Sequence, residues 1–137
     1  MKREYSFDSN IGVSICTLYD TKFTSQGIAI CHDDDKAFMS ERTGLQIAEA
    51  RAEINMLKMI RDYELTPALI ALQHLQTNMT TSKHYNPKSY EARMLRRQVN
   101  IKQNEIKAVQ QEIKVIEEFL ENYITSKNKL YNKDKKD

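Results

Sequence analysis

The longest regular pattern in this sequence is a heptad repeat of apolar residues in its C-terminal third. Residues 88–137 contain no Gly or Pro, and an apolar seam recurs there at spacings of three and four: Leu95, Val99, Ile106, Val109, Ile113, Ile116, Leu120, Tyr123 and Leu130. Lys102 and Lys127 occupy two of the seam positions. A helix from Asn86 to Leu130 would be roughly 65 Å long. Such a seam must be buried against earlier helices, a second copy, or both, so we expect a homo-oligomer.

The N-terminal part carries the alternating pattern of β-strands. Within residues 5–32, the segment IGVSICTLYD alternates apolar and small side chains, which is typical of a half-buried strand. GIAICH places Ile28 and Ile30 on one side and Ala29 and Cys31 on the other, and TKFTSQG has the composition of a hairpin turn. Because two or three strands alone are barely stable, one face must pack on helices or on another subunit.

Two shorter helices are predicted between the strands and the seam. Residues 36–64 place four apolar side chains on one helical face: Ile47, Ala50, Ile54 and Leu57. Thr66–Pro67 predicts a cap and the first position of a second helix, 66–80, and Asn86–Pro87 repeats this signal before the long helix, 86–130. We expect an α+β fold in one domain, residues 1–137. A small N-terminal antiparallel β-sheet is followed by long antiparallel α-helices that mediate oligomerisation.

The composition is that of a soluble chain with balanced charge. A formal net charge of +2 does not indicate a general DNA-binding protein, so any anion site has to be local. There is no run of eighteen apolar residues, and the N-terminus lacks the features of a secretory signal. Cys16 and Cys31 could pair across neighbouring strands, but without an export signal we expect two reduced thiols in a cytoplasmic protein.

The segment SKHYNPKSYEARMLRR, residues 82–97, holds the strongest candidate for a binding site. A helix start at Asn86–Pro87 exposes free backbone N–H groups and the positive end of the helix dipole, which suit an anion. Tyr85 can present its ring face to a base, and His84 can touch a ligand. Lys88 and Ser89 can donate to phosphate oxygens, and a bound anion would relieve the unfavourable placement of Lys88 in a first turn. The alternative is an ordinary helix cap that binds nothing.

Four further side chains extend this candidate site. Tyr90, Arg93 and Arg97 follow at spacings of three and four and form one stripe. Arginine binds phosphate through a bidentate fork, whereas the alternative is a solvated face with ion pairs to Glu91. Arg51 stands between two glutamates. It is either an ion-paired flank residue or a guanidinium delivered into the same cleft from another helix or subunit.

Catalysis and metal binding find little support in the sequence. His32 and Asp33–Asp35 are metal-ligating residue types, but consecutive aspartates before a helix are typical of caps, and no HExxH or CxxC spacing completes a site. His74 is expected to be a packed, hydrogen-bonded imidazole. The chain contains no glycine-rich phosphate loop and no nucleophile elbow. We expect no enzyme activity, cofactor or metal. The enzymatic alternative is a nucleotide hydrolase built on His32 and the aspartates.

The order of elements and three segments resemble the first Thoeris anti-defence family of phage and prophage proteins. These segments are CTLYD, MSERTGLQIAEARAEI and YNPKSYEARMLRRQ, and the resemblance covers about residues 5 to 125. It implies a sponge, because proteins of that family bind cyclic ADP-ribose isomers made by TIR-domain sensors of the Thoeris system and hold them intact. It also implies hexamers built from dimers, with ligand pockets between protomers. In some members, separate sites hold cyclic trinucleotides of CBASS.

Carried over by position, the resemblance implies that Tyr85 and Asn86 belong to the cyclic ADP-ribose pocket, with Arg51 as a contributor. Arg93 and Arg97 would contact phosphates in one site or the other. The expected function is sequestration of glyco-cyclic ADP-ribose in the cytoplasm of an infected bacterial host, without a membrane or a nucleic-acid polymer as partner. The alternative is a coiled-coil phage structural or nucleic-acid-binding protein that uses these arginines and the lysine-rich tail on phosphate backbones.

Overall fold

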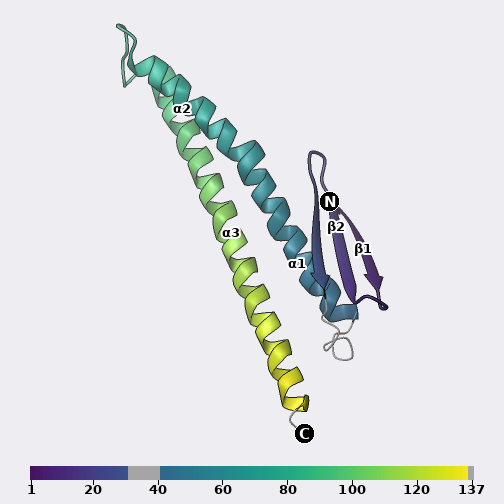
Figure 1. The fold of residues 1–137 in the computed structure, drawn as a ribbon. Coiled ribbons are helices and arrows are strands. Elements are labelled where there is room, and N and C mark those ends of the chain that lie inside the picture. The colour runs from purple at the N-terminus through teal and green to yellow at the C-terminus, as the bar shows by residue number, and fades with distance from the viewer. Residues whose placement is uncertain (31–40, 136–137) are drawn as a thin grey trace. The chain divides into compact units, whose positions relative to one another are not determined.

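The computed structural model describes residues 1–30 and 41–135 (Figure 1). Strands β1 (Lys2–Asp8), β2 (Val13–Tyr19) and β3 (Thr24–Ile30) precede helix α1 (Glu41–Ile60), the π-helical turn η2 (Arg61–Leu65), α2 (Thr66–Thr80) and α3 (Tyr90–Lys135). The predicted α+β class, a small N-terminal antiparallel sheet followed by long helices, is confirmed. The chain divides into two compact units. The first unit comprises Met1–Lys58 with Ile113–Asp137, and the second comprises Met59–Glu112.

The three strands form an antiparallel sheet in the order β1-β2-β3. Tyr5 pairs with Cys16, and Cys16 pairs with Gly27, so these three residues share one face of the sheet. The turn between β1 and β2 contains Gly12 with φ 65°, a left-handed conformation that glycine adopts without strain. The second turn is closed by a hydrogen bond from Asp20 N–H to the Phe23 carbonyl (2.8 Å).

The two faces of this sheet differ in the size of their side chains. The buried face carries mainly small residues: Ser14, Cys16 and Leu18 on β2, and Ser25, Gly27 and Ala29 on β3. The larger Ile28 and Ile30 point to the opposite face and are 44% and 66% exposed. The alternation in the sequence therefore predicted strands, and the face that the helix covers is the one with the small side chains.

Helix α1 packs closely on the small-residue face of the sheet. A Cβ atom at Gly27 would overlap the α1 backbone at Ala48 and Ala52, and a Cβ atom at Gly44 would overlap the Ser14 side chain. Ser25 Oγ donates to the Ala52 carbonyl at 2.8 Å. Glycine on both surfaces lets the helix approach the strands closely, which explains why α1 tolerates Gly44 within its first turns.

A second stripe of α1 is also buried, and it is the stripe that the sequence pattern predicted. Ile47, Ala50 and Ile54 are each at most 6% exposed. In the same unit, the C-terminal part of α3 lies along α1. Tyr123 Oη donates to Gln46 Oε1, and Lys58 Nζ lies 3.9 Å from Glu117. Since α1 is covered on two sides, it lacks a pronounced polar face.

The helical turns before Pro67 differ from the sequence prediction. Thr66 was expected to be an N-cap, but Leu65 and Thr66 have helical backbone angles, and η2 joins α1 to α2 without a break. The Thr66 N–H bonds to the Arg61 carbonyl, five residues back. Pro67 cannot donate to the carbonyl four residues earlier and would crowd it in a regular α-helix. The wider π-turn accommodates this proline, so the chain continues as a helix.

In the second unit, α2 and the first half of α3 run antiparallel and are joined by residues 81–89 (Figure 1). The predicted seam lies on the more buried side of α3, where Val99 is buried and Leu95, Ile106 and Val109 are half-buried. No residue of α2 is fully buried, although this helix is rich in apolar side chains. Among the described residues, no helix is both long and apolar enough to cross a membrane.

Candidate ligand-binding site

The connection between α2 and α3 is a short, well-bonded turn segment, residues 81–89. The last turn of α2 is closed by hydrogen bonds from Thr81 N–H to the Thr77 carbonyl and from Ser82 N–H to the Met79 carbonyl. The next turn is held by the His84 N–H, which donates to Ser82 Oγ at 3.3 Å, and by the Tyr85 N–H, which donates to the Ser82 carbonyl at 3.2 Å. Local hydrogen bonds therefore give this exposed segment a defined conformation.

Asn86 and Ser89 have distinct roles in this segment, and this corrects the predicted helix start. Helix α3 begins at Tyr90, not at Asn86–Pro87, and Ser89 Oγ accepts a hydrogen bond from Ala92 N–H (3.2 Å), as an N-cap does. Asn86 Oδ1 accepts from Lys88 N–H (3.0 Å) and forms the turn before the cap. Asn86 and Ser89 are thus one turn apart, and the exposed Asn86 side chain keeps its NH₂ group as a donor.

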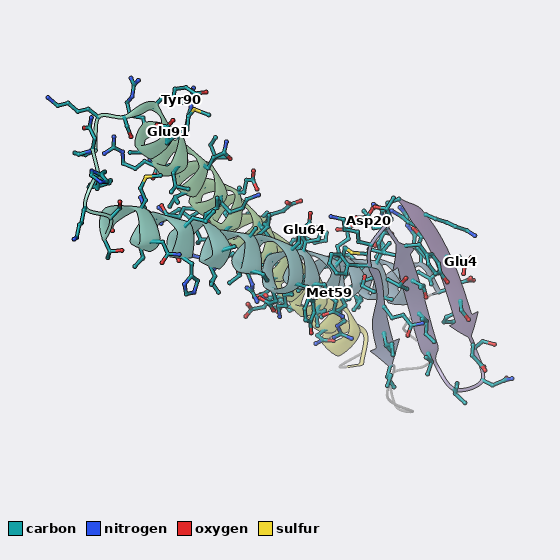
Figure 2. The ribbon with its side chains drawn as sticks, turned by 90° about the horizontal axis from the view of Figure 1, so that it is seen from above. Glu4, Asp20, Met59, Glu64, Tyr90 and Glu91 are labelled. Carbon is teal, nitrogen blue, oxygen red and sulfur yellow. The ribbon has the colours of Figure 1, made fainter. Side chains whose placement is uncertain are left out.

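The same segment presents aromatic rings beside the helix start. Tyr85 is half-buried, His84 is exposed, and Tyr90 in the first turn of α3 is 65% exposed. Figure 2 shows Tyr90 and Glu91 at this end of α3. Each ring offers a face on which a planar base can stack.

Positive charge gathers on the same short stretch. Residues 82–97 contain five cationic side chains and one carboxylate, Glu91, whereas α2 has no Asp, Glu, Lys or Arg. All five are exposed: Lys83, Lys88, Arg93, Arg96 and Arg97. Sequence reasoning missed Arg96, whose guanidinium donates to the Pro87 carbonyl (2.7 Å) and braces the turn. Arg96 does not lie on the Arg93–Arg97 stripe, and its position in the sequence does not indicate a hydrogen bond to Pro87. We call residues 83–97 the basic turn.

Arg51 lies in the other compact unit, on α1, and does not form ion pairs with the flanking glutamates, which was one of its two alternatives. The neighbouring Glu49 and Glu53 both pair with Arg3 of β1, and the Arg3–Glu53 distance is 3.2 Å. Arg51 instead donates from Nη1 to the Ile28 carbonyl at 2.7 Å. It is half-exposed and lines a cavity of about 330 Å³ together with Gln26, Ile28, Ile54 and Asn55. The structure thus places the candidates from His84 to Arg97 on one unit and Arg51 in a pocket on the other.

The remaining candidates from the sequence are His74, the two cysteines and the segment His32–Asp35. His74 was predicted to be packed but is exposed on α2. Cys16 is a buried free thiol, and burial raises its pKa, with the Glu49 carboxylate as a weaker cause. Cys31, His32 and Asp33–Asp35 lie outside the described residues. Within residues 1–30 and 41–135, no group of three His, Cys, Asp or Glu side chains is arranged to hold a metal ion.

Comparison with known proteins identifies no relative: no protein-family model matches the chain, and no curated protein and no solved structure matches it significantly. The function is therefore inferred from the residues of the basic turn and of the Arg51 pocket.

Proposed function

We propose that this chain is a phage-encoded anti-defence sponge that binds cyclic ADP-ribose isomers, above all glyco-cyclic ADP-ribose, and sequesters them without breaking them. The observation that carries the proposal is the basic turn, in which exposed cations and aromatic rings lie close in sequence to a braced helix start. A ligand with a pyrophosphate, riboses and an adenine has the complementary groups. The family resemblance of YNPKSYEARMLRRQ supports the same ligand class.

Each part of the basic turn has a role in this proposal. The N–H groups at the start of α3 and the guanidinium groups of Arg93 and Arg97 suit the pyrophosphate, with Lys88 and Ser89 as further donors. Tyr85 and Tyr90 suit the adenine ring, and His84 borders them. The free NH₂ group of Asn86 is a donor to a phosphate or ribose oxygen. Arg51 lies in the other unit, and we propose that it reaches this ligand from a second copy of the chain, because the family resemblance implies ligand pockets between protomers.

The magnitudes are sufficient for tight binding without catalysis. Stacking on an aromatic side chain contributes about 1–3 kcal/mol per base. Each hydrogen bond to a charged group contributes about 1.5–3 kcal/mol. A few of each reach the roughly −12 kcal/mol of a nanomolar complex. A sponge needs this affinity and no general acid, base or nucleophile.

Exposed apolar side chains support the homo-oligomer that belongs to this proposal. Ile70 and Leu75 on α2 and Ile101 on α3 remain exposed within one unit, and Phe119 on α3 remains exposed within the other. A second copy that covers these side chains would remove apolar surface from water at about 25 cal/mol per Å². We propose dimer-based assembly, up to a hexamer, and light scattering after gel filtration tests it. A monomer at micromolar concentration would contradict it.

Calorimetry with glyco-cyclic ADP-ribose tests the proposed function directly. We expect nanomolar affinity for the parent chain and release of unaltered ligand on heating, as measured by mass spectrometry. Hydrolysed ligand would instead support the enzymatic alternative. Absence of binding by the parent would refute the sponge.

Variants then test the residues. Asn86→Ser keeps an oxygen that can accept from the Lys88 N–H but lacks the amide NH₂ group, so a loss of affinity shows that Asn86 contacts the ligand and does not act only through the turn. Arg93→Ala should weaken binding by at least about tenfold, the effect of one charge-assisted hydrogen bond. Lys107→Ala, an exposed cation of α3 outside the basic turn, is the matched control and should bind as the parent does.

A further inference from the structure

The Arg51 pocket, at the edge of β3, is also lined by Asn55, and the hydrogen bond of Asn55 determines the orientation of its side-chain amide. Asn55 lies four residues after Arg51, and therefore on the same face of α1. Its Nδ2 donates to the Gln26 carbonyl at 2.7 Å, while Arg51 Nη1 donates to the Ile28 carbonyl at 2.7 Å. The rise from Arg51 to Asn55 along the helix is about 6 Å, and the rise from Gln26 to Ile28 along the strand is about 6.7 Å. The distance between the two donors on α1 therefore matches the distance between the two carbonyls on β3.

These two hydrogen bonds leave different groups of Asn55 and Arg51 at the pocket wall. A backbone carbonyl accepts and cannot donate, so the Asn55 amide must turn its NH₂ group toward Gln26 and its Oδ1 away. Asn55 therefore presents an acceptor with a fixed position. Arg51 commits one of its five N–H donors to Ile28, and its charge remains at the same wall.

The other lining residues suit a flat ring. Ile28, which is 44% exposed at the edge strand, and the buried Ile54 also line the pocket and give it apolar surface. A volume of about 330 Å³ lies at the small end of ligand pockets, which run from roughly 300 to 1,000 Å³. It has room for one ring system and not for a complete dinucleotide.

We infer that this pocket reads the edge of the adenine base and that Asn55 is its specificity-determining residue, while the tyrosine rings of the basic turn of a second copy stack on the face of the same base. The 6-amino group of adenine is a hydrogen-bond donor, which Asn55 Oδ1 accepts, and Arg51 attracts the phosphates of the same ligand. Hypoxanthine carries a 6-oxo group at that position, which would place two acceptors against each other. The inference rests on the proposed function and adds to it a preference for adenine over hypoxanthine.

Two ligands and three proteins test this inference by calorimetry. The ligands are glyco-cyclic ADP-ribose and the same molecule with hypoxanthine in place of adenine. The parent should bind the adenine ligand roughly ten- to hundredfold more tightly, because the wrong base leaves Oδ1 unpaired. Asn55→Ala should reduce this ratio to near one. Arg51→Ala should weaken both ligands by a similar factor and keep the ratio.

The outcomes separate the inference from the function on which it rests. If the parent binds both ligands with equal affinity, the pocket does not distinguish adenine from hypoxanthine and the inference fails, while the sponge function stands. This measurement requires no variant. A ratio that persists in Asn55→Ala also overturns the assignment of Asn55. If the parent binds neither ligand, both proposals fail.

Discussion

Gly27 of β3 lies directly against the backbone of α1 at Ala48. A Cβ atom at position 27 would overlap the Ala48 carbonyl oxygen and the Ala52 amide nitrogen, and neither backbone group can move without displacing the helix. Both positions are buried. The distance between α1 and the sheet therefore depends on the absence of a side chain at this position.

The first prediction is that Gly27→Ala destabilises the unit formed by the sheet and α1. One added methyl group in a packed interior costs about 1–3 kcal/mol, and an overlap with backbone atoms belongs at the upper end of this range. Urea unfolding followed by circular dichroism measures the change. Ser6→Ala, at an exposed position of β1, should change the unfolding free energy by less than about 0.5 kcal/mol. Equal stability of Gly27→Ala and the parent would contradict the close packing.

This packing also shows what the sequence could predict about the sheet. The alternation of residues 11–16 and 27–31 indicated two strands, because period 2 needs only the local pattern. It did not reveal that α1 covers the face of Ser14, Cys16 and Gly27, since the larger isoleucines on the other face have the higher hydrophobicity. That choice depends on Gly44 and Ala48, which are distant in sequence and have surfaces that fit only small partners.

The second prediction concerns the start of α3. Ser89→Ala removes the acceptor of the Ala92 N–H and should destabilise the protein by about 0.5–2 kcal/mol. Ser126→Ala makes the same exchange at an exposed position inside α3, where no cap is lost, and should be close to neutral. Thermal unfolding of both variants checks the difference. If both variants melt as the parent does, Ser89 does not cap the helix.

The candidate site was predictable in its residue types and less so in its geometry. Proline at the first helical position is a valid start signal, but the backbone forms one more turn after Pro87. In that turn the Asn86 side chain accepts from the Lys88 N–H, and Ser89 then caps α3 by accepting from the Ala92 N–H. Arg96 escaped detection because its role is a bond to the Pro87 carbonyl, nine residues back, which only the folded turn creates. Similarly, the sequence did not indicate that Arg3, far away in the chain, pairs with Glu49 and Glu53. Because these glutamates pair with Arg3, the Arg51 guanidinium is available to donate to the Ile28 carbonyl.

The third prediction uses the buried thiol of Cys16. Burial raises the pKa of Cys16 in the folded state, whereas a cysteine in the unfolded chain has a pKa of about 8.5. The folded state therefore binds this proton more tightly. The contribution of Cys16 to stability is complete below the unfolded pKa and is lost as the pH rises above it. In Cys31→Ser, Cys16 is the remaining cysteine, and its thiol should react slowly with a disulfide reagent at pH 8 and rapidly in denaturant. Rapid reaction of the native protein would show that Cys16 is accessible.

The last prediction separates the sponge from the nucleic-acid-binding alternative by the salt dependence of binding. A polymer that engages Lys88, Arg93, Arg96 and Arg97 releases condensed counterions, and the slope of log K against log salt would be about −3.6 for four phosphate contacts on duplex DNA. Glyco-cyclic ADP-ribose carries a single pyrophosphate and no condensed ion atmosphere, so its slope should be much shallower. Fluorescence anisotropy with a labelled duplex and calorimetry with the small ligand, between 50 and 200 mM salt, provide both slopes. Tight binding of the duplex with a steep slope, together with weak binding of the cyclic nucleotide, would favour the nucleic-acid-binding alternative. Exposed cations alone bind any polyanion, so they would be enough for the duplex. The rings of Tyr85 and Tyr90 contribute to affinity only where a base can stack on them.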